Sequence, residues 1–329
     1  MTYPELRTGA RSKLAGAAIA ALLSLSVMQG CSADVVERTY DPPVGSRWII
    51  DSETRTEDTR PEGPRSSLIN MRAEMTIEAK TPDGFRITYV NRGATIEGND
   101  PMVPIYRSSL KALENVPIRA TTDRAGKPVH VDNLDEAKTA MRNMLGNVSE
   151  PFKDKPQVLA VLKQMVNGLI EVDADKAAEA YIDEMPLLAK AQNTGMKVGE
   201  IRRSSRTIDN PMGNAGALKS SEAFEMKAAD AATGRRVYVN TTSYDVASMK
   251  DFMQSMTRKL MAAAGNNARL GEIDSLVKSM VLTLDDRTVF EVEDGMTRKI
   301  EEKSVTTIRA MGHNLQKVET KTFTVTRAP

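Results

Sequence analysis

Apolar and polar residues alternate with a period of two along much of the chain after residue 44. In residues 72–80 the odd positions 73 to 79 are apolar, and the even positions carry charged residues or threonine. Asp83-Gly84 then supplies a turn, and residues 85–89 continue the apolar face on a return strand. Because each strand has one apolar and one polar face, the pattern predicts an antiparallel sheet covered on one side.

The same alternation predicts most of the other strands. The polar stretch 57–67, which contains Pro61, Gly63 and Pro64, is expected to be an exposed loop. The remaining expected strands and hairpins are 47–56, 118–131 turning at 124–126, 198–208, 223–239 turning at 233–234, 281–284, 287–293, 297–311 and 315–327.

The middle of the chain changes to helical spacing. Asn133 and Glu136 have the spacing of a capping box, and the apolar positions that follow predict a helix that stops at Gly146. Further helices are expected at 156–169, 174–184, 246–264 and 273–278. Pro186 is expected to interrupt the helix that begins at residue 174.

Strands that precede and follow helical segments in one sheet indicate an α+β fold. We expect an antiparallel sheet with amphipathic helices packed on it. Tyr-Val-Asn occurs at 89–91 and again at 238–240, each time on the return strand of a predicted hairpin. This echo suggests two related halves, 44–193 and 196–329. Matches this short also arise by chance, so an unrepeated domain over 44–329 remains open.

The first 30 residues have the layout of a secretory signal peptide. Basic residues (Arg7, Arg11 and Lys13) precede an apolar run over residues 14–28. The run is shorter than the roughly 20 residues that a membrane-spanning helix needs. A buried core helix is the weaker interpretation, because polar residues and Pro42-Pro43 follow directly.

The end of this segment resembles the lipobox of bacterial lipoproteins. Gly30-Cys31 fits that motif and Met28 is tolerated in it, whereas Gln29 stands where a small residue is usual. The resemblance implies that Cys31, the single cysteine, carries acyl chains such as palmitate after residues 1–30 are removed, with 31–43 as a short tether to the membrane. Ser32 implies the outer membrane, facing the periplasm. An ordinary cleaved secretion signal is the alternative.

Composition and motifs narrow the function classes. The 45 Lys+Arg and 44 Asp+Glu nearly cancel, which argues against a nucleic-acid partner. Two histidines, His130 and His313, and one cysteine leave too few nitrogen and sulfur ligands for a zinc site. Nucleotide-binding and nucleophile-elbow motifs are absent from the sequence. We therefore expect no cofactor, no metal and no catalysis.

One set of short motifs keeps an envelope hydrolase as a remote alternative. Ser108–Lys111, Tyr238–Asn240 and Lys321–Phe323 follow the order used by penicillin-binding enzymes. Phe323 replaces the glycine that such a site needs for substrate to approach the strand, so we expect these matches to be coincidental.

Methionine is the informative apolar residue, with 19 copies against 6 Phe, 7 Tyr and 1 Trp. On the predicted helix 246–264 an apolar face is formed by Met249, Phe252, Met253, Met256 and Leu260. Such a face packs into a core in most proteins. Flexible methionine surfaces also adapt to irregular apolar ligands, so these five residues are the candidate ligand-binding site.

Long antiparallel strands interrupted by amphipathic helices, after a lipobox, resemble the superfamily of lipoprotein-localisation factors. The stretch 288–327 is similar to the terminal strands of bacterial lipoproteins related to that group. The resemblance implies a curved antiparallel sheet, a half-barrel, on which the amphipathic helices pack as a lid. It also implies a concave apolar surface that binds a lipid, an acyl chain or a lipidated partner. The alternative is a structural or adaptor lipoprotein that binds another envelope protein along a sheet edge.

Overall fold

The computed structural model describes residues 38–329 except for a set of short gaps. Contacts divide the chain into two units, residues 1–34 and 35–329, and every described residue belongs to the second unit. The gaps are 61–62, 101–102, 104–106, 108–109, 112–113, 150–152, 155–158, 160–162, 164–166, 169, 209–216, 264–270, 272–274, 276, 278 and 311–312.

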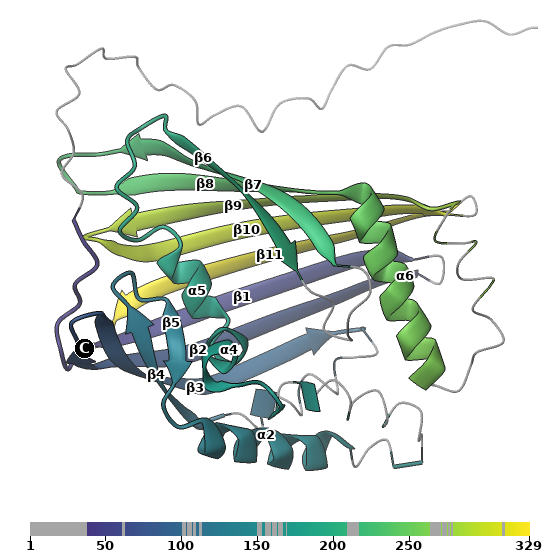
Figure 1. Cartoon of the computed structure of the whole chain (residues 1–329), viewed down its shortest axis with the longest axis horizontal. Coiled ribbons are helices and arrows are strands. Elements are labelled where there is room, and N and C mark those ends of the chain that lie inside the picture. The colour runs from purple at the N-terminus through teal and green to yellow at the C-terminus, as the bar shows by residue number, and fades with distance from the viewer. Residues whose placement is uncertain are drawn as a thin grey trace, which may run out of the picture. The chain divides into compact units, whose positions relative to one another are not determined.

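An 11-stranded antiparallel sheet forms the framework of this unit (Figure 1). Its strand order is β5-β4-β3-β2-β1-β11-β10-β9-β8-β7-β6, so the sheet is open and has β5 and β6 as its edges. The strands are β1 (Arg47–Arg60), β2 (Gly63–Lys80), β3 (Gly84–Gly98), β4 (Pro117–Asp123), β5 (Pro128–Val131), β6 (Ile201–Ile208), β7 (Leu218–Ala229), β8 (Arg236–Tyr244), β9 (Val281–Glu293), β10 (Met296–Ala310) and β11 (His313–Arg327).

The first and last strands meet at the centre of the sheet. β1 pairs with β11 from Trp48↔Arg327 to Thr59↔Gln316, so the strands before residue 132 form one side of the sheet and those after residue 200 the other. The two Tyr-Val-Asn sequences lie on β3 and β8. The predicted halves thus coincide with two contiguous sets of strands, and their origin by duplication stays a prediction.

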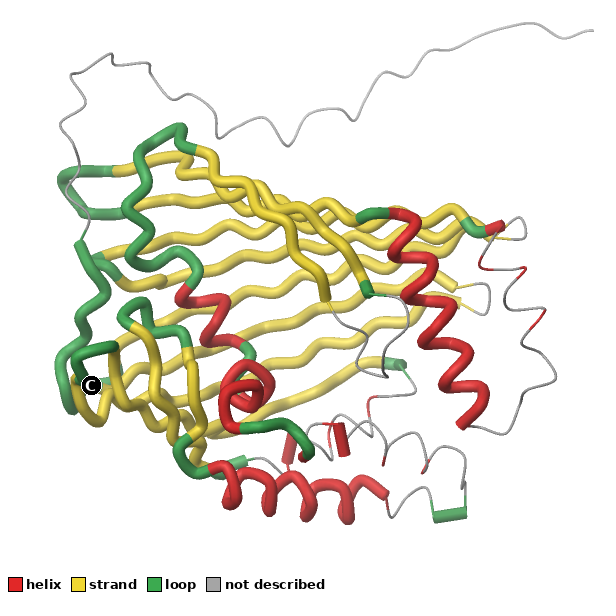
Figure 2. Tube along the Cα trace, in the orientation of Figure 1, coloured by secondary structure: helices red, strands yellow, loops and turns green. Residues whose placement is uncertain are grey.

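Helices pack against one face of the sheet, which we call the inner face (Figure 2). Asp173 caps the N-terminus of the helix over residues 174–181, because its carboxylate accepts a hydrogen bond from the backbone N–H of Lys176 at 2.9 Å. The helices are α2 (Leu134–Ser149), α4 (Ala174–Tyr181), α5 (Glu184–Ala189) and α6 (Val246–Ala263). Among the described helices, none is long and apolar enough to cross a membrane.

The inner face carries two separate apolar clusters. The larger cluster contains Met75, Phe290 and Ile300 from the strands, packed against Ile182 and Leu188 from the α4–α5 region. The smaller cluster lies under α6 and joins Met249 to Val277, Met280 and Leu282. Between the two clusters the inner positions of the central strands are polar.

Charged pairs cover the opposite face, which we call the outer face. Arg72 binds Asp51 at 2.7 Å, and Arg235 binds Glu291 at 2.6 Å. Their positions alternate with buried residues along the same strands, as the period of two predicts. The coarse fold prediction is therefore confirmed: a large antiparallel sheet with a few helices on it.

The structure corrects several element boundaries. Residues 57–60 and 63–67 of the expected loop are strand instead, because they belong to β1 and β2 and pair from Glu57↔Ser66 to Arg60↔Gly63. Strands predicted at 281–284 and 287–293 are one continuous strand, β9. The ladder to a neighbouring strand holds these polar segments extended, although their sequences favour turns.

Two helix predictions also change. α2 runs past Gly146 to Ser149. The helix expected over 174–184 ends at Tyr181, and Pro186 lies in the first turn of α5, where its missing N–H leaves no hydrogen bond unmade. Most of the helices expected at 156–169 and 273–278 lies outside the described residues.

Phe290→Ala is expected to lower the free energy of unfolding by about 3–5 kcal/mol, because Phe290 is fully buried in the larger cluster. Glu291→Ala on the outer face of the same strand should cost less than about 1 kcal/mol. Urea unfolding of both variants measures the difference. Equal costs would contradict the assignment of the inner face.

Candidate functional site

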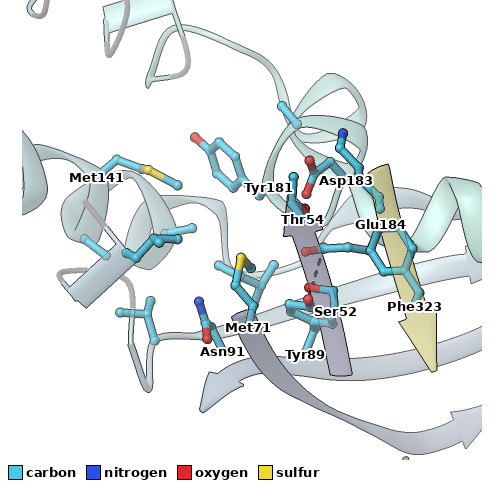
Figure 3. A pocket seen from close by; sticks show the side chains of 17 residues that line it. Ser52, Thr54, Met71, Tyr89, Asn91, Met141, Tyr181, Asp183, Glu184 and Phe323 are labelled. Carbon is cyan, nitrogen blue, oxygen red and sulfur yellow. Dashed lines mark hydrogen bonds between the residues drawn. The ribbon is translucent and has the colours of Figure 1, made fainter. Parts of the chain in front are cut away.

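A pocket of about 470 Å³ lies between the inner face of the sheet and the helices that follow β5. Strands β1, β2, β3, β4 and β11 form its floor, and α2 and the α4–α5 region form its walls (Figure 3). Its volume falls in the range of small-molecule sites, about 300–1,000 Å³.

Apolar side chains line most of the pocket. Met71 and Phe323 rise from neighbouring parts of the sheet, because Ser52 pairs with Met71 on one side and Phe323 on the other. Met141 faces them from α2 (Figure 3). The other apolar lining residues are Leu110, Val116, Ile118, Ala137, Ala140 and Ala180. This lining suits an apolar chain better than a polar metabolite.

Polar groups gather at the end of the pocket near α5. The Tyr89 hydroxyl donates a hydrogen bond to Glu184 Oε2 at 3.0 Å, joining β3 to the first turn of α5 (Figure 3). Burial, together with the nearby charge of Asp183, raises the pKa of Glu184 to about 8. Glu184 is therefore mostly protonated at neutral pH and is compatible with an apolar neighbour.

Lys321 is the cation among the pocket-lining residues. Burial acts to lower its pKa, but the carboxylates of Glu302 and Glu319 outweigh burial and leave the pKa raised. Its ammonium group lies 3.3 Å from Glu319 Oε1. Lys321 marks the boundary where the pocket meets the polar part of the inner face.

Two of the five candidate residues on α6 take part in the smaller apolar cluster. Met249 is 5% exposed in that cluster, and Met253 packs against it. Phe252 is half-buried, and the side chains of Met256 and Leu260 lie outside the described residues. The pocket is lined by other elements, so the ligand-binding role of the α6 face stays a prediction, and the core interpretation fits Met249.

The other singled-out residues fall in three places. Cys31 and its lipobox lie outside the described residues. The ring of His130 is exposed, with Nδ1 2.7 Å from Asp175 Oδ1 on α4. The side chain of His313 is not described. Within the described ranges, no group of three His, Cys, Asp or Glu side chains is arranged to hold a metal ion.

Sequence reasoning missed the pocket residues. Tyr89 lies on a correctly predicted strand and Met141 on a correctly predicted helix, but their alternation and helical spacing also fit an ordinary core. Met71 lies on β2 just before residue 72, where the predicted strand began. Glu184 offered the one local signal of a site, because an acidic residue there precedes the buried residues Met185 and Leu188 in a short helix. Only the docking of α5 near a residue 95 positions away makes it part of a site.

Comparisons with known proteins leave the family open. No family model matches the chain, and no curated protein matches it. Among solved structures, a lipovitellin studied for its lipid–protein interactions is similar with 9% identity and a TM-score of 0.42 over 88% of this chain, which spans only 26% of that protein. An outer membrane channel from Pseudomonas putida F1 has 6% identity and a TM-score of 0.18, covering 89% of this chain and 99% of the channel. Both scores are too low to show a shared fold.

The raised pKa of Glu184 predicts a pH-dependent stability. A glutamate in the unfolded chain has a pKa of about 4.3. Between that value and about 8 the unfolded chain binds fewer protons than the folded one, so the free energy of unfolding falls as pH rises, by up to about 1.4 kcal/mol per pH unit.

Glu184→Gln should therefore reduce this loss and exceed the wild type in stability at pH 8, as measured by urea unfolding across pH 5–8. Glu301→Gln on the outer face is the matched control and should keep the wild-type slope. An unchanged slope in Glu184→Gln would contradict the protonated, buried state of this side chain.

Proposed function

We propose that this chain is a lipid-anchored, non-catalytic envelope protein that binds an apolar ligand in the pocket under α2, α4 and α5. The ligand is a lipid, an acyl chain or the acyl group of a lipidated partner. The single observation that supports this best is the apolar lining: Met71, Met141 and Phe323 face about 470 Å³ of space. Each methylene removed from water there contributes about 0.8 kcal/mol.

The proposal also includes the finer architecture. The inner face is the concave side of a half-barrel, and the helices act as the lid, as in the superfamily of lipoprotein-localisation factors. Lipidated Cys31 holds the domain at the outer membrane on the periplasmic side through the tether 31–43. The two halves of the sheet, 44–193 and 196–329, derive from one repeated unit.

Native mass spectrometry tests the ligand. Residues 32–329 are exported behind a cleavable secretion signal and purified without detergent; this protein contains the whole compact unit from residue 35. An adduct of lipid mass is expected. Ala140→Trp should remove it by filling the pocket, because Ala140 lines the cavity. Thr139→Trp on the exposed side of α2 is the control and should keep it.

A bare protein mass in the folded wild type would contradict the proposal. Loss of the adduct in Met253→Ala, with retention in Ala140→Trp, would instead place the ligand on the methionine face of α6.

An adaptor role is a second candidate, favoured by the edge strand β6. Its side chains from 201 to 207 are all exposed, and Arg202, Arg203 and Arg206 give it a positive charge. The opposite edge is covered, since Lys127 and His130 near β5 bind acids of α4. An open, basic edge suits an acidic extended segment of another envelope protein, although arginines also guard edges against aggregation.

Photo-crosslinking in cells tests this second candidate. A crosslinker at Ser205 on β6 should capture one partner, whereas the same group at Thr283, exposed on the interior strand β9, should not. Equal capture at both positions would contradict docking at the edge.

A further inference from the structure

The polar part of the inner face forms a continuous band across the central strands. In register, Lys321 on β11 lies opposite Glu302 on β10, and Glu302 lies opposite Thr288 on β9. One step further along the strands, Glu319 lies opposite Ser304, which lies opposite Asp286. We call this set, together with Asn240, Thr242 and Glu222 on β8 and β7, the polar band.

Each ammonium group that lies on or beside the polar band already has a carboxylate partner among the described residues. Lys321 lies 3.3 Å from Glu319, which also binds Lys317 at 2.8 Å. Lys190, which follows α5, binds Glu222 at 2.6 Å. These three ammonium groups face four carboxylates, those of Glu222, Glu302, Glu319 and Asp286, so one negative charge is left in excess. Burial raises the pKa of Glu302; Lys321 opposes this shift, and the charges of Asp286 and Glu319 add to it.

Two acceptor atoms of the band lack donors. Among the described residues, none donates a hydrogen bond to Asn240 Oδ1 or to Asp286 Oδ1. Asn240 is only 5% exposed, and Asp286 is half-buried and uses its other oxygen to accept a bond from the Tyr244 hydroxyl at 2.5 Å. Asn240 and Asp286 are diagonal neighbours on β8 and β9, with backbones about 7–8 Å apart. Buried acceptors without donors are costly, so this spot favours a donor-rich or positively charged group.

The polar band begins where the pocket ends. Thr54 and Lys321, a cross-strand pair, both line the pocket, and Lys321 is opposite Glu302 of the band. A ligand with its apolar chain between α2 and the sheet would therefore reach the band with its other end. The chemistry of that end is set by the surplus of carboxylates and free acceptors.

We propose that the ligand is an amphiphile with a protonated amine, which lies on the polar band at Glu302 and Asp286 and whose N–H groups donate to the unpaired acceptor oxygens of Asn240 and Asp286. This inference rests on the proposed function, because it takes the apolar chain to occupy the pocket. It excludes a free fatty acid as the preferred ligand, since a carboxylate would face the excess negative charge.

Three amphiphiles that share a ten-carbon chain test the apolar pocket and the preference for a cationic group separately. Decylammonium, decyl maltoside and decyl sulfate are titrated below their critical micelle concentrations into residues 32–329, with affinities from isothermal titration calorimetry. We expect the cation to bind about three- to tenfold more tightly than the neutral compound and the anion to bind most weakly. Added salt should reduce the advantage of the cation.

Substitutions in the band locate the charged group. Glu302→Gln and Asp286→Asn should each lower the affinity for the cation by about three- to tenfold and leave the affinity for decyl maltoside unchanged. Glu301→Gln and Asp285→Asn are matched controls, because these acids are the exposed neighbours on the same two strands. Both controls should bind the cation like the wild type.

The outcomes are distinguishable. Equal binding of cation and neutral compound, tighter binding of the anion, or equal losses in Glu301→Gln and Glu302→Gln would overturn this inference and leave the pocket proposal standing. Failure of all three amphiphiles to bind would contradict the pocket proposal and this inference together.

Discussion

An open antiparallel sheet of eleven strands has two broad faces, and only a face covered by other elements can be apolar. The outer face of this chain meets that constraint with charged pairs such as Arg72–Asp51. On the inner face the described helices pack over two clusters, one around Phe290 and one around Met249. The arrangement of pocket and polar band follows from how this coverage is divided.

Between the clusters, the inner positions change from hydrophobic to ionisable within a few residues of the same strands. On β9 the change runs from buried Phe290 through Thr288 to Asp286, and on β11 from Phe323 to Lys321 and Glu319. The pocket lies where the larger cluster gives way to the band, so one end is apolar and the other polar. A site with this polarity selects amphiphilic ligands, because each end of such a ligand meets a matching environment.

Much of the fold could be predicted from the sequence because local patterns determine it. The alternation around Met75 and the turn at Asp83-Gly84 fixed the β2–β3 hairpin, and the apolar face of residues 246–264 predicted α6. The prediction of a loop over 57–67 was wrong, because the pairing of β1 with β2 overrides the local preference of these residues for turns. The pocket could not be predicted, since the contact between Tyr89 and Glu184 depends on how distant segments dock.

An apolar chain in the pocket would lie against Met71 and Met141, so the methyl groups of these methionines can report its binding. Nuclear magnetic resonance of methionine methyl groups, assigned by single substitutions, measures which of them sense a bound decyl chain. We expect chemical-shift changes at Met71 and Met141, with Met249 and Met280 in the smaller cluster unaffected. Changes confined to Met249 and Met280, or none in any methionine at saturating ligand, would contradict it.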